Sequence, residues 1–430
     1  MKRQINKHLR RGFAGVPWWI ALIAIAGCGK SSEPAAPVQS SAVLFEGGRL
    51  ITGSGASIEN AAFLVENGRF VTVGAAGEVP LPAGAQRVDL SGKTVIPAII
   101  DAHTHLSTTR DELIVDLERR AYYGIGAALS LGSDDASTPL EIREEVLPNA
   151  ARYRSAGLGI TAPEPGRREV HWVTTEEAAR QAVRTEADRK VEIVKIWVDD
   201  RDGKFQKLSP ALYRAVIDEA HQRGLKVAAH IFALDDAKEL LRAGIDIFAH
   251  GVRDRDIDEE FVSLIKARPN VVLIPNLPNR GVATDVSWLA SSVSAEELGK
   301  LQESAKDDPK AQAAFGIQAR NLARLAREGV TIALGTDGNT PWAPHVELED
   351  TVVAGLSPAD ALVAATRNSA AVVGLSDTGT IEAGKRADFV VLEANPLEDI
   401  KNTRRISSVY LSGDQVSRTE KPAAAAKRES

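Results

Sequence analysis

Residues 95–106 read Val-Ile-Pro-Ala-Ile-Ile-Asp-Ala-His-Thr-His-Leu, an apolar run that ends in two histidines one residue apart. Side chains at positions i and i+2 of a strand point to the same face, so His103 and His105 can aim at one point past a buried strand. Neutral imidazole is the commonest nitrogen ligand of catalytic metals. Two such histidines alone are more often surface or structural residues, so further ligands are needed downstream.

The composition is that of a large globular protein. The chain has 430 residues, 44% of them hydrophobic and 26% charged, which is enough for one large domain or two. The first 27 residues carry five Lys and Arg side chains and no acid, so their removal takes the net charge from −6 to −11. An acidic body argues against nucleic acid as a partner. The oligomeric state is left open, with a homo-oligomer allowed.

The N-terminus has a basic start followed by the apolar run Val16–Gly27, which is short for a membrane-spanning helix. The run ends at Cys28, the only cysteine, and resembles a bacterial lipoprotein signal in which this cysteine is lipidated. We expect a signal peptide over residues 1–27, a flexible tether over 28–41, and export to the cell envelope with a lipid anchor, facing the periplasm or in the outer membrane. The alternatives are a plain secretory signal or an uncleaved anchor.

Short strands with tight turns occupy both ends of the remaining chain. An Asn-Gly pair at residues 67–68 separates two apolar runs, which is a strong hairpin signal. Similar strands recur near the C-terminus. We therefore expect residues 42–95 and 378–417 to form one small β-sandwich domain, and the charged, Ala-rich residues 418–430 to be a disordered tail.

Residues 96–377 alternate apolar strands with helical patterns such as Pro210–Arg223 and Leu234–Ala243. The expected strands end near His103, Leu131, Thr161, Val198, His230, His250, Asn276 and Asp337. Eight such units are typical of the α/β class and fit a (β/α)8 TIM barrel, which usually has about 250 residues. The connection over residues 277–321 is long, and we expect it to form a lid or extra helices.

Functional residues of such a barrel lie at the carboxyl ends of its strands. Strands one, four, five, six and eight carry, in order, His103 with His105, Lys195, His230, His250 and Asp337. Each has a structural alternative, as a core histidine, a snorkelling lysine or a helix-capping aspartate. Their recurrence at successive strand ends favours a metal site.

This order of residues resembles the amidohydrolase superfamily, which has His-x-His after strand one, Lys after strand four, His after strands five and six, and Asp after strand eight. The resemblance covers Ala42–Ser417 and includes the closing segment Ala-Gly-Lys-Arg-Ala-Asp-Phe-Val-Val at residues 383–391. The spacing is most similar to binuclear members related to Xaa-Pro dipeptidases and imidazolonepropionase-like hydrolases.

The resemblance implies two divalent metal ions, with zinc as the expected metal. It assigns the more buried ion to His103, His105 and Asp337. It assigns the more exposed ion to His230 and His250.

The resemblance also implies that Lys195 is carboxylated and bridges both ions. Burial and nearby cations favour a neutral amine, which can add carbon dioxide to form an anionic carbamate. The alternative is an unmodified Lys195 beside a single metal. The implied reaction is attack of a metal-bridging hydroxide on an amide carbonyl, with Asp337 as the general base that passes the proton to the leaving nitrogen.

Substrate contacts are predicted for three further residues. His171 follows the third strand and is a candidate for a catalytic contact to the substrate carbonyl or carboxylate. His345 follows strand eight and is a candidate for the edge of the pocket. Arg280, like Arg167 and Arg168, could bind a substrate carboxylate with two hydrogen bonds. A loop residue in solvent is the alternative reading of these side chains.

The expected function is hydrolysis of a small-molecule amide, with dipeptides and N-acyl or N-aryl amino-acid amides, including mycotoxin conjugates, as leading substrates. Some dipeptidase-like relatives have a tyrosine just after the strand-five histidine, where this chain has Phe232, so dipeptidase specificity stays open. An alternative is a mononuclear deaminase or cyclic-imide hydrolase, which usually lacks the strand-four lysine. A non-enzyme alternative is a ligand-binding lipoprotein on an inactive barrel.

Overall fold

The computed structural model describes residues 42–167 and 169–419, which belong to one compact unit over residues 39–430. The expected signal peptide, the lipidation site Cys28, the tether and the tail beyond Thr419 lie outside the described residues. Within the part of the chain that the structure describes, no helix has the length and apolar character needed to cross a membrane.

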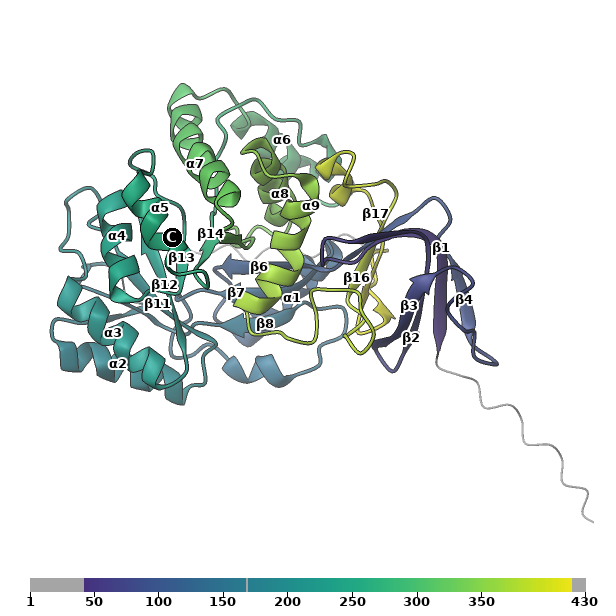
Figure 1. Cartoon of the computed structure of the whole chain (residues 1–430), viewed down its shortest axis with the longest axis horizontal. Helices are drawn as coiled ribbons and strands as arrows, with labels where there is room; N and C mark the ends of the chain where they lie inside the picture. Colours follow the sequence, from purple (N-terminus) through teal and green to yellow (C-terminus); the bar gives the residue numbers. More distant parts are fainter. Residues whose placement is uncertain (1–41, 168, 420–430) are drawn as a thin grey trace, which may run out of the picture. The chain divides into compact units, whose positions relative to one another are not determined.

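Both ends of the described chain contribute to one mixed sheet (Figure 1). Its order is β18-β17-β16-β5-β1-β2-β3, and β4 also pairs with β1. The strands are β1 (Val43–Ile51), β2 (Ser57–Glu66), β3 (Arg69–Ala75), β4 (Gln86–Asp89), β5 (Thr94–Pro97), β16 (Phe389–Leu392), β17 (Ile406–Leu411) and β18 (Asp414–Gln415). The antiparallel pair of β5 and β16 joins the two ends of the chain. The arrangement of these strands as a β-sandwich stays a prediction.

The β2–β3 hairpin forms at the predicted Asn-Gly turn. Asn67 has φ 52° and Gly68 has φ 74°, the left-handed pair that a type I′ turn requires. Beneath the hairpin, the rings of Phe45 and Phe63 stack with centroids 5.0 Å apart, and Phe389 meets Phe45 edge-on at 5.1 Å. Aromatic residues from both chain ends therefore share one core.

The remaining strands form two sheets in which every pair is parallel. Seven strands have the order β10-β9-β11-β12-β13-β14-β15, and three have the order β6-β7-β8. Their bounds are β6 (Ile99–Thr104), β7 (Ile125–Ser130), β8 (Arg152–Ser155), β9 (Gly159–Thr161), β10 (Val170–Trp172), β11 (Ile193–Val198), β12 (Lys226–Ile231), β13 (Ile247–Ala249), β14 (Val272–Ile274) and β15 (Thr331–Ile332). The predicted α/β class with parallel strands is confirmed.

Backbone hydrogen bonds connect the two parallel sheets on both sides. On one side, Ala102 of β6 donates to Leu334, just beyond β15, at 2.9 Å. On the other side, Glu192 donates to Ser155 of β8 at 3.1 Å. The first of these bonds brings the ends of β6 and β15 together, while closure into an eight-stranded barrel stays a prediction.

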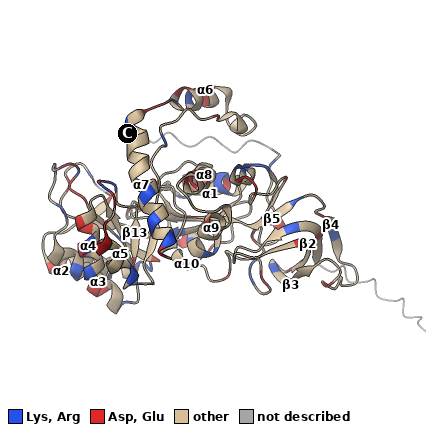
Figure 2. Cartoon of the chain, turned by 45° about the horizontal axis from the view of Figure 1, so that its top comes forward, with Lys and Arg blue, Asp and Glu red and all other residues tan. Residues whose placement is uncertain are grey.

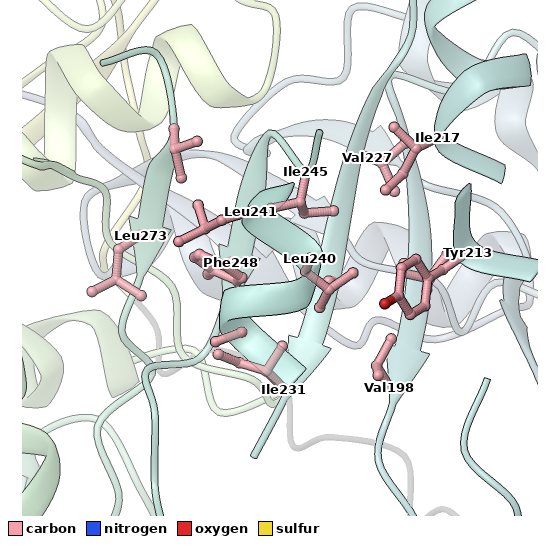
Figure 3. Packing of buried hydrophobic residues seen from close by; sticks show 14 of the residues in the cluster. Val198, Tyr213, Ile217, Val227, Ile231, Leu240, Leu241, Ile245, Phe248 and Leu273 are labelled. Atoms are coloured by element: carbon pink, nitrogen blue, oxygen red, sulfur yellow. The ribbon is translucent and has the colours of Figure 1, made fainter. Parts of the chain in front are cut away.

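The helices are α1 (Arg110–Tyr122), α2 (Glu176–Asp188), α3 (Pro210–Gln222), α4 (Leu234–Ala243), α5 (Glu259–Lys266), α6 (Ala295–Ser304), α7 (Pro309–Arg327), α8 (Ala343–Val353), α9 (Pro358–Val363) and α10 (Ser369–Val372). Apolar residues of α3 and α4, such as Tyr213 and Leu240, pack on Val198 and Phe248 of the strands (Figure 3). Acidic and basic residues mix on the outer helices α2 to α5 (Figure 2). A buried Leu or Phe side chain contributes roughly 1.5–3 kcal/mol, so this packing holds the strands that carry the site.

Two helices follow the prediction closely. The helix predicted over Pro210–Arg223 is α3, whose Pro210 occupies the first turn, and α4 has the predicted bounds and ends before Gly244 at φ 105°. The long connection after β14 contains α6, a 3-10 turn at Ser287–Leu289 and the first part of α7, which confirms extra helices. Its action as a lid stays a prediction.

Strands β8 and β10 are absent from the prediction. In β8, Tyr153 and Ser155 are buried while the two arginines between and before them are partly exposed, so the strand lacks a continuous apolar run. The tail prediction also starts too early, because Arg418 donates to the backbone oxygens of Tyr122 and Ile406. The ordered chain therefore extends at least to Arg418.

Candidate metal centre

Three histidines converge on the carboxylate of Asp337 at the carboxyl ends of the parallel strands. Nε2 of His103 and Nε2 of His105 lie 3.1 Å and 2.9 Å from Asp337 Oδ1. Nε2 of His250, which follows β13, lies 3.6 Å from Asp337 Oδ2. Residues up to 234 positions apart in sequence thus meet at one point.

His230 and Lys195 border this group on neighbouring strands. The His230 ring, at the end of β12, has its centroid 4.6 Å from that of His250, while its Nε2 lies 3.2 Å from Asp199 Oδ2. Lys195 lies within β11 and is completely buried. A Cβ at Gly132 would come within 2.6 Å of the Lys195 side chain, so the absence of a side chain there makes room for the lysine.

Local backbone geometry aims these side chains. His250 has φ 94° and Asp337 has φ 55°, left-handed conformations that non-glycine residues rarely adopt and that cluster at functional sites. The Asp337 turn is held because its N–H donates to His103 O at 2.7 Å. The backbone N–H and hydroxyl of Thr336 also donate to the carboxylate of Asp101, at 3.1 Å and 2.7 Å. The surrounding contacts therefore compensate the strain.

Burial keeps the nitrogen ligands neutral. It lowers the pKa of His103 to about 3 and the pKa of His230 to about 4. Burial, followed by the nearby charge of Arg253, holds the pKa of His250 well below its usual range. Burial also lowers the pKa of Lys195 to about 7, well under its ordinary value. Each side chain can therefore offer a lone pair near neutral pH.

Asp337 supplies the negative charge of the group. Burial acts to raise the pKa of this carboxyl, but its interactions with the neighbouring His103 and His105 outweigh burial and hold the pKa below its usual range. An ionised carboxylate among neutral imidazoles is a suitable environment for a divalent cation.

The residues present fit a metal centre. His103, His250 and Asp337 each offer a ligand atom, and these atoms all lie within 4.8 Å of one another. Among the described residues, four buried nitrogens lack a hydrogen-bond partner, namely His103 Nε2, His105 Nδ1, Lys195 Nζ and His250 Nδ1. A buried polar atom without a partner costs about 1–3 kcal/mol, so four around one carboxylate need a common explanation, which a bound cation provides.

Several residues that support the group were not singled out in the sequence. Asn276 Oδ1 lies 2.9 Å from His103 Nδ1. The Asp101 carboxylate accepts a hydrogen bond from Thr336 and so fixes the turn that leads to Asp337. The Asp199 carboxylate accepts hydrogen bonds from His230 and Arg201. All three lie within two residues of a predicted strand end, so the strand-end criterion applied to every polar residue would have found them.

His171 lies beyond the strand that ends at Thr161, as predicted, but within a further strand, β10, rather than in a loop. Its Nε2 is 2.8 Å from Glu186 Oε1 of helix α2. Glu186 is buried and also binds Arg189. Its catalytic contact to the substrate stays a prediction, in competition with this hydrogen bond.

The predicted substrate contact of His345 is wrong. The side chain is buried, its Nδ1 lies 3.1 Å from Thr403 Oγ1, and its Nε2 lies 2.9 Å from the Tyr123 carbonyl oxygen. Both ring nitrogens are therefore engaged within the protein. His345 follows strand eight in sequence, but it lies in the first turn of helix α8, which directs it into the core.

Arg280 lines a cavity of about 490 Å³ but does not bring a free charge to it. Its guanidinium lies 2.8 Å from Glu349 Oε1 and 2.8 Å from Asp350 Oδ1. The cavity also contains Thr336, which directly precedes Asp337, and its apolar lining comes from Leu277, Val282, Val286, Leu301, Trp342 and Val346. The cavity is suited to an apolar group near the candidate metal centre.

Comparisons with known proteins identify similar chains. The sequence model of a protein family, described as "Amidohydrolase family", matches residues 94–416. Imidazolonepropionase of Deinococcus radiodurans is 25% identical over 356 residues, covering 76% of this chain and 85% of that protein. Ochratoxinase of Aspergillus niger is 29% identical over 299 residues, covering 65% of this chain and 56% of the fungal protein, so the chain spans little more than half of that relative.

Solved structures share the fold. A Xaa-Pro dipeptidase structure superposes with a TM-score of 0.70 at 20% identity, covering 87% of this chain and 99% of that one. The structure of A. niger ochratoxinase gives a TM-score of 0.69 at 22% identity, covering 88% of this chain and 96% of that one. At this level of identity the likeness concerns the fold.

Proposed function

Because this chain belongs to the amidohydrolase family, we propose that it is a metal-dependent hydrolase that cleaves an amide bond of a small molecule at the His103–His105–Asp337 centre. Hydrolysis of carbon–nitrogen bonds is the chemistry of this family and of the relatives named above. The observation that carries the proposal is the convergence of three histidines on one ionised carboxylate, with buried nitrogen atoms that have no other partner among the described residues.

The proposed cofactor is a pair of divalent ions, with zinc as the expected metal. His103, His105 and Asp337 would hold one ion, and His230 and His250 would hold the other. The short distances from both His103 and His105 to Asp337 support the first group. The 4.6 Å separation of the His230 and His250 rings supports the second. His250 also lies near Asp337, so the two groups adjoin.

Carboxylation of Lys195 is proposed as the link between the groups. The amine would attack carbon dioxide, forming a nitrogen–carbon bond and releasing one proton, and the resulting carbamate would supply anionic oxygens. Complete burial and a pKa near 7 leave much of the amine neutral and therefore nucleophilic at physiological pH. An anionic group at this position would also balance the positive charge of the nearby Arg253, Arg167 and Arg201.

Asp337 is proposed as the general base. When bound, the metals would lower the pKa of a water molecule and polarise the substrate carbonyl. The carboxylate of Asp337 would accept a proton from the attacking water and deliver it to the nitrogen as the carbon–nitrogen bond breaks. The hydrogen bonds from Thr336 to Asp101 would hold the adjacent Asp337 carboxylate in place during both proton transfers.

The proposed substrates are dipeptides and N-acyl or N-aryl amides of amino acids. The names ochratoxinase and Xaa-Pro dipeptidase, borne by a relative and a fold neighbour, agree with this class. The second candidate is a single-metal deaminase or cyclic-imide hydrolase, which the imidazolonepropionase relative favours. The buried, unpaired Lys195 amine distinguishes the two, because a single-metal site gives it no role.

Two structural expectations accompany this function. We propose that the parallel strands close into an eight-stranded barrel, which the backbone bonds between the two sheets support. We also propose export and lipid anchoring through Cys28.

The proposed function is tested by metal analysis and a substrate screen of the purified chain. Zinc-loaded protein should contain close to two ions and release the amine from at least one dipeptide, N-acyl amino acid or aryl amide. The His250→Ala variant should lose metal and turnover, whereas the control His221→Ala, on the outer helix α3, should retain both. Fewer than two ions after loading with zinc and bicarbonate would contradict the binuclear assignment.

A further inference from the structure

Arg253, which was not singled out in the sequence, lies close to the candidate metal centre. Arg253 follows His250 by three residues in the segment after β13. Its backbone N–H donates to the Phe232 carbonyl oxygen at 2.9 Å, so this segment is tied to the residues that follow His230. The arginine is therefore held between the ends of β12 and β13, where the two histidines of the second group lie.

The positive charge of Arg253 acts on the centre itself. Its guanidinium interacts electrostatically with the carboxylates of Asp337 and Asp199. Together with the backbone bond to Phe232 and the three-residue separation from His250, this places Arg253 at the strand ends that carry the second histidine group.

The neighbouring arginines differ from Arg253 because their charges are compensated. Arg201 lies 3.0 Å from Asp199 and 3.2 Å from Glu164, and Arg167 lies 3.3 Å from Glu164. Among the described residues, Arg253 makes no ion pair, and its buried Nε atom has no hydrogen-bond partner. Burial opposes the charge on Arg253 and lowers its pKa.

Arg253 is partly buried, and a guanidinium without an ion pair in this setting is suited to an anionic partner, because burial of an unpaired charge is costly. Asp199 is one alternative partner, but its carboxylate already accepts hydrogen bonds from His230 and Arg201. The planar guanidinium matches a carboxylate with two parallel hydrogen bonds. Next to it, the Phe232 side chain is 40% exposed, which offers an apolar surface to the body of the same ligand.

We propose that Arg253 is a specificity-determining residue that binds the carboxylate of the amino-acid half of the substrate. The enzyme would then prefer dipeptides and N-acyl amino acids with a free carboxylate over neutral amides of the same shape. This inference rests on the proposed amide hydrolysis and names the part of the substrate that the site recognises. Arg253, rather than the ion-paired Arg280, would carry the anion-binding role.

The first test compares N-benzoyl-phenylalanine with its carboxamide, N-benzoyl-phenylalaninamide, with benzoate release as the readout on zinc-loaded protein. Alanyl-proline and its carboxamide form a second pair if the first is not cleaved. Arg253→Gln should lower kcat/KM for the acid by about 10- to 100-fold, the usual range for loss of a charge-assisted hydrogen bond. It should change kcat/KM for the carboxamide less than threefold. Arg255→Gln is the matched control, because this arginine lies two residues away and pairs with Asp235.

A binding measurement keeps the inference separate from the proposed function. Calorimetric titration of zinc-loaded protein with 3-phenylpropionate, which cannot be hydrolysed, should give at least tenfold weaker binding in Arg253→Gln than in the wild type or Arg255→Gln. Equal binding in all three proteins would overturn the role of Arg253, even if amides are cleaved. Arg253-dependent binding without cleavage of any amide would instead support the site and refute the proposed function. An equal loss of kcat/KM on acid and carboxamide would also overturn the inference.

Discussion

His103 and Asn276 are joined by a hydrogen bond of 2.9 Å between Nδ1 and Oδ1, although 173 residues separate them in sequence. The amide oxygen can only accept, so the proton is assigned to His103 Nδ1, and Nε2 keeps its lone pair toward Asp337. Asn276 itself has φ 44°, a left-handed conformation at the end of β14. The segment after the neighbouring strand therefore selects the tautomer and the orientation of a candidate metal ligand.

Replacement of Asn276 should weaken metal binding without removing a ligand. In Asn276→Ala the His103 ring loses its acceptor, and loss of such a partner typically lowers metal affinity about 10- to 100-fold. Zinc affinity measured by competition with a chelator checks this. Asn279→Ala is the control, since that side chain accepts from Gly281 in its own loop. Equal affinity of Asn276→Ala and the wild type would show that His103 needs no partner.

Asp337→Asn should separate metal binding from proton transfer. The amide keeps an oxygen and most of the shape of the carboxylate, but it does not accept a proton from water. We expect near-normal metal content and a fall in turnover of about 10²- to 10⁴-fold, the range of general base catalysis. The control Asp414→Asn changes an exposed residue of strand β18 in the mixed sheet. Undiminished turnover would remove Asp337 from the proton-transfer role.

The strand-end histidines were readable from sequence because they follow apolar runs, and the structure brings these residues together. The left-handed φ angles of His250 and Asp337 were not readable, since they depend on contacts such as the bond from the Asp337 N–H to His103 O. The role of Asn276 also depends on the pairing of distant strands. The local sequence pattern thus locates a candidate ligand, whereas tertiary contacts set the direction of its side chain.

His345 and Arg253 also show that sequence position alone does not determine the surroundings of a side chain. His345 follows a strand end in sequence, yet the helix that begins at Ala343 directs it into the core. Arg253 lies three residues past a candidate ligand, yet only the absence of an ion pair among the described residues distinguishes it from other loop arginines. Ion pairing between loops is decided by the fold, so the sequence favoured Arg280 for a role that the structure offers to Arg253.

The stability of the fold should depend on pH through His345. Burial lowers its pKa from 6.5 to about 4 in the folded protein. Between these pH values the unfolded chain binds a proton that the folded chain does not, so the stabilisation present above pH 6.5 is lost as the pH falls toward 4, by about 3 kcal/mol. His345→Gln removes this dependence while it keeps a hydrogen-bond donor.

The measurement is thermal unfolding of the wild type and His345→Gln at pH 7.5 and pH 5, with chelator present so that metal release is equal in both. The variant should have the lower Tm at pH 7.5, and the difference in Tm between the two proteins should be smaller at pH 5. A constant gap at both pH values would mean that His345 is not buried as a neutral side chain.

Membrane association should depend on Cys28. If the signal is of the lipoprotein type, Cys28→Ala removes the atom that carries the lipid, and the protein should be released to the soluble fraction or remain unprocessed. Fractionation of cells and the mass of the mature N-terminus check this. Ser31→Ala, in the expected tether, is the control. Unchanged membrane association of Cys28→Ala would leave an uncleaved anchor as the explanation.

Lys195→Ala should lower metal content as well as turnover, because the buried amine has no other partner among the described residues. We expect the bound zinc to fall from about two ions per chain to one or fewer, with loss of amide hydrolysis. Wild-type protein prepared with ¹³C-bicarbonate should also show a carbamate signal by NMR that is absent from the variant. Lys226→Ala, at the exposed start of β12, should leave metal, signal and turnover unchanged. A Lys195→Ala protein that retains two ions would rule out the bridging lysine and shift the assignment to histidines and Asp337 alone.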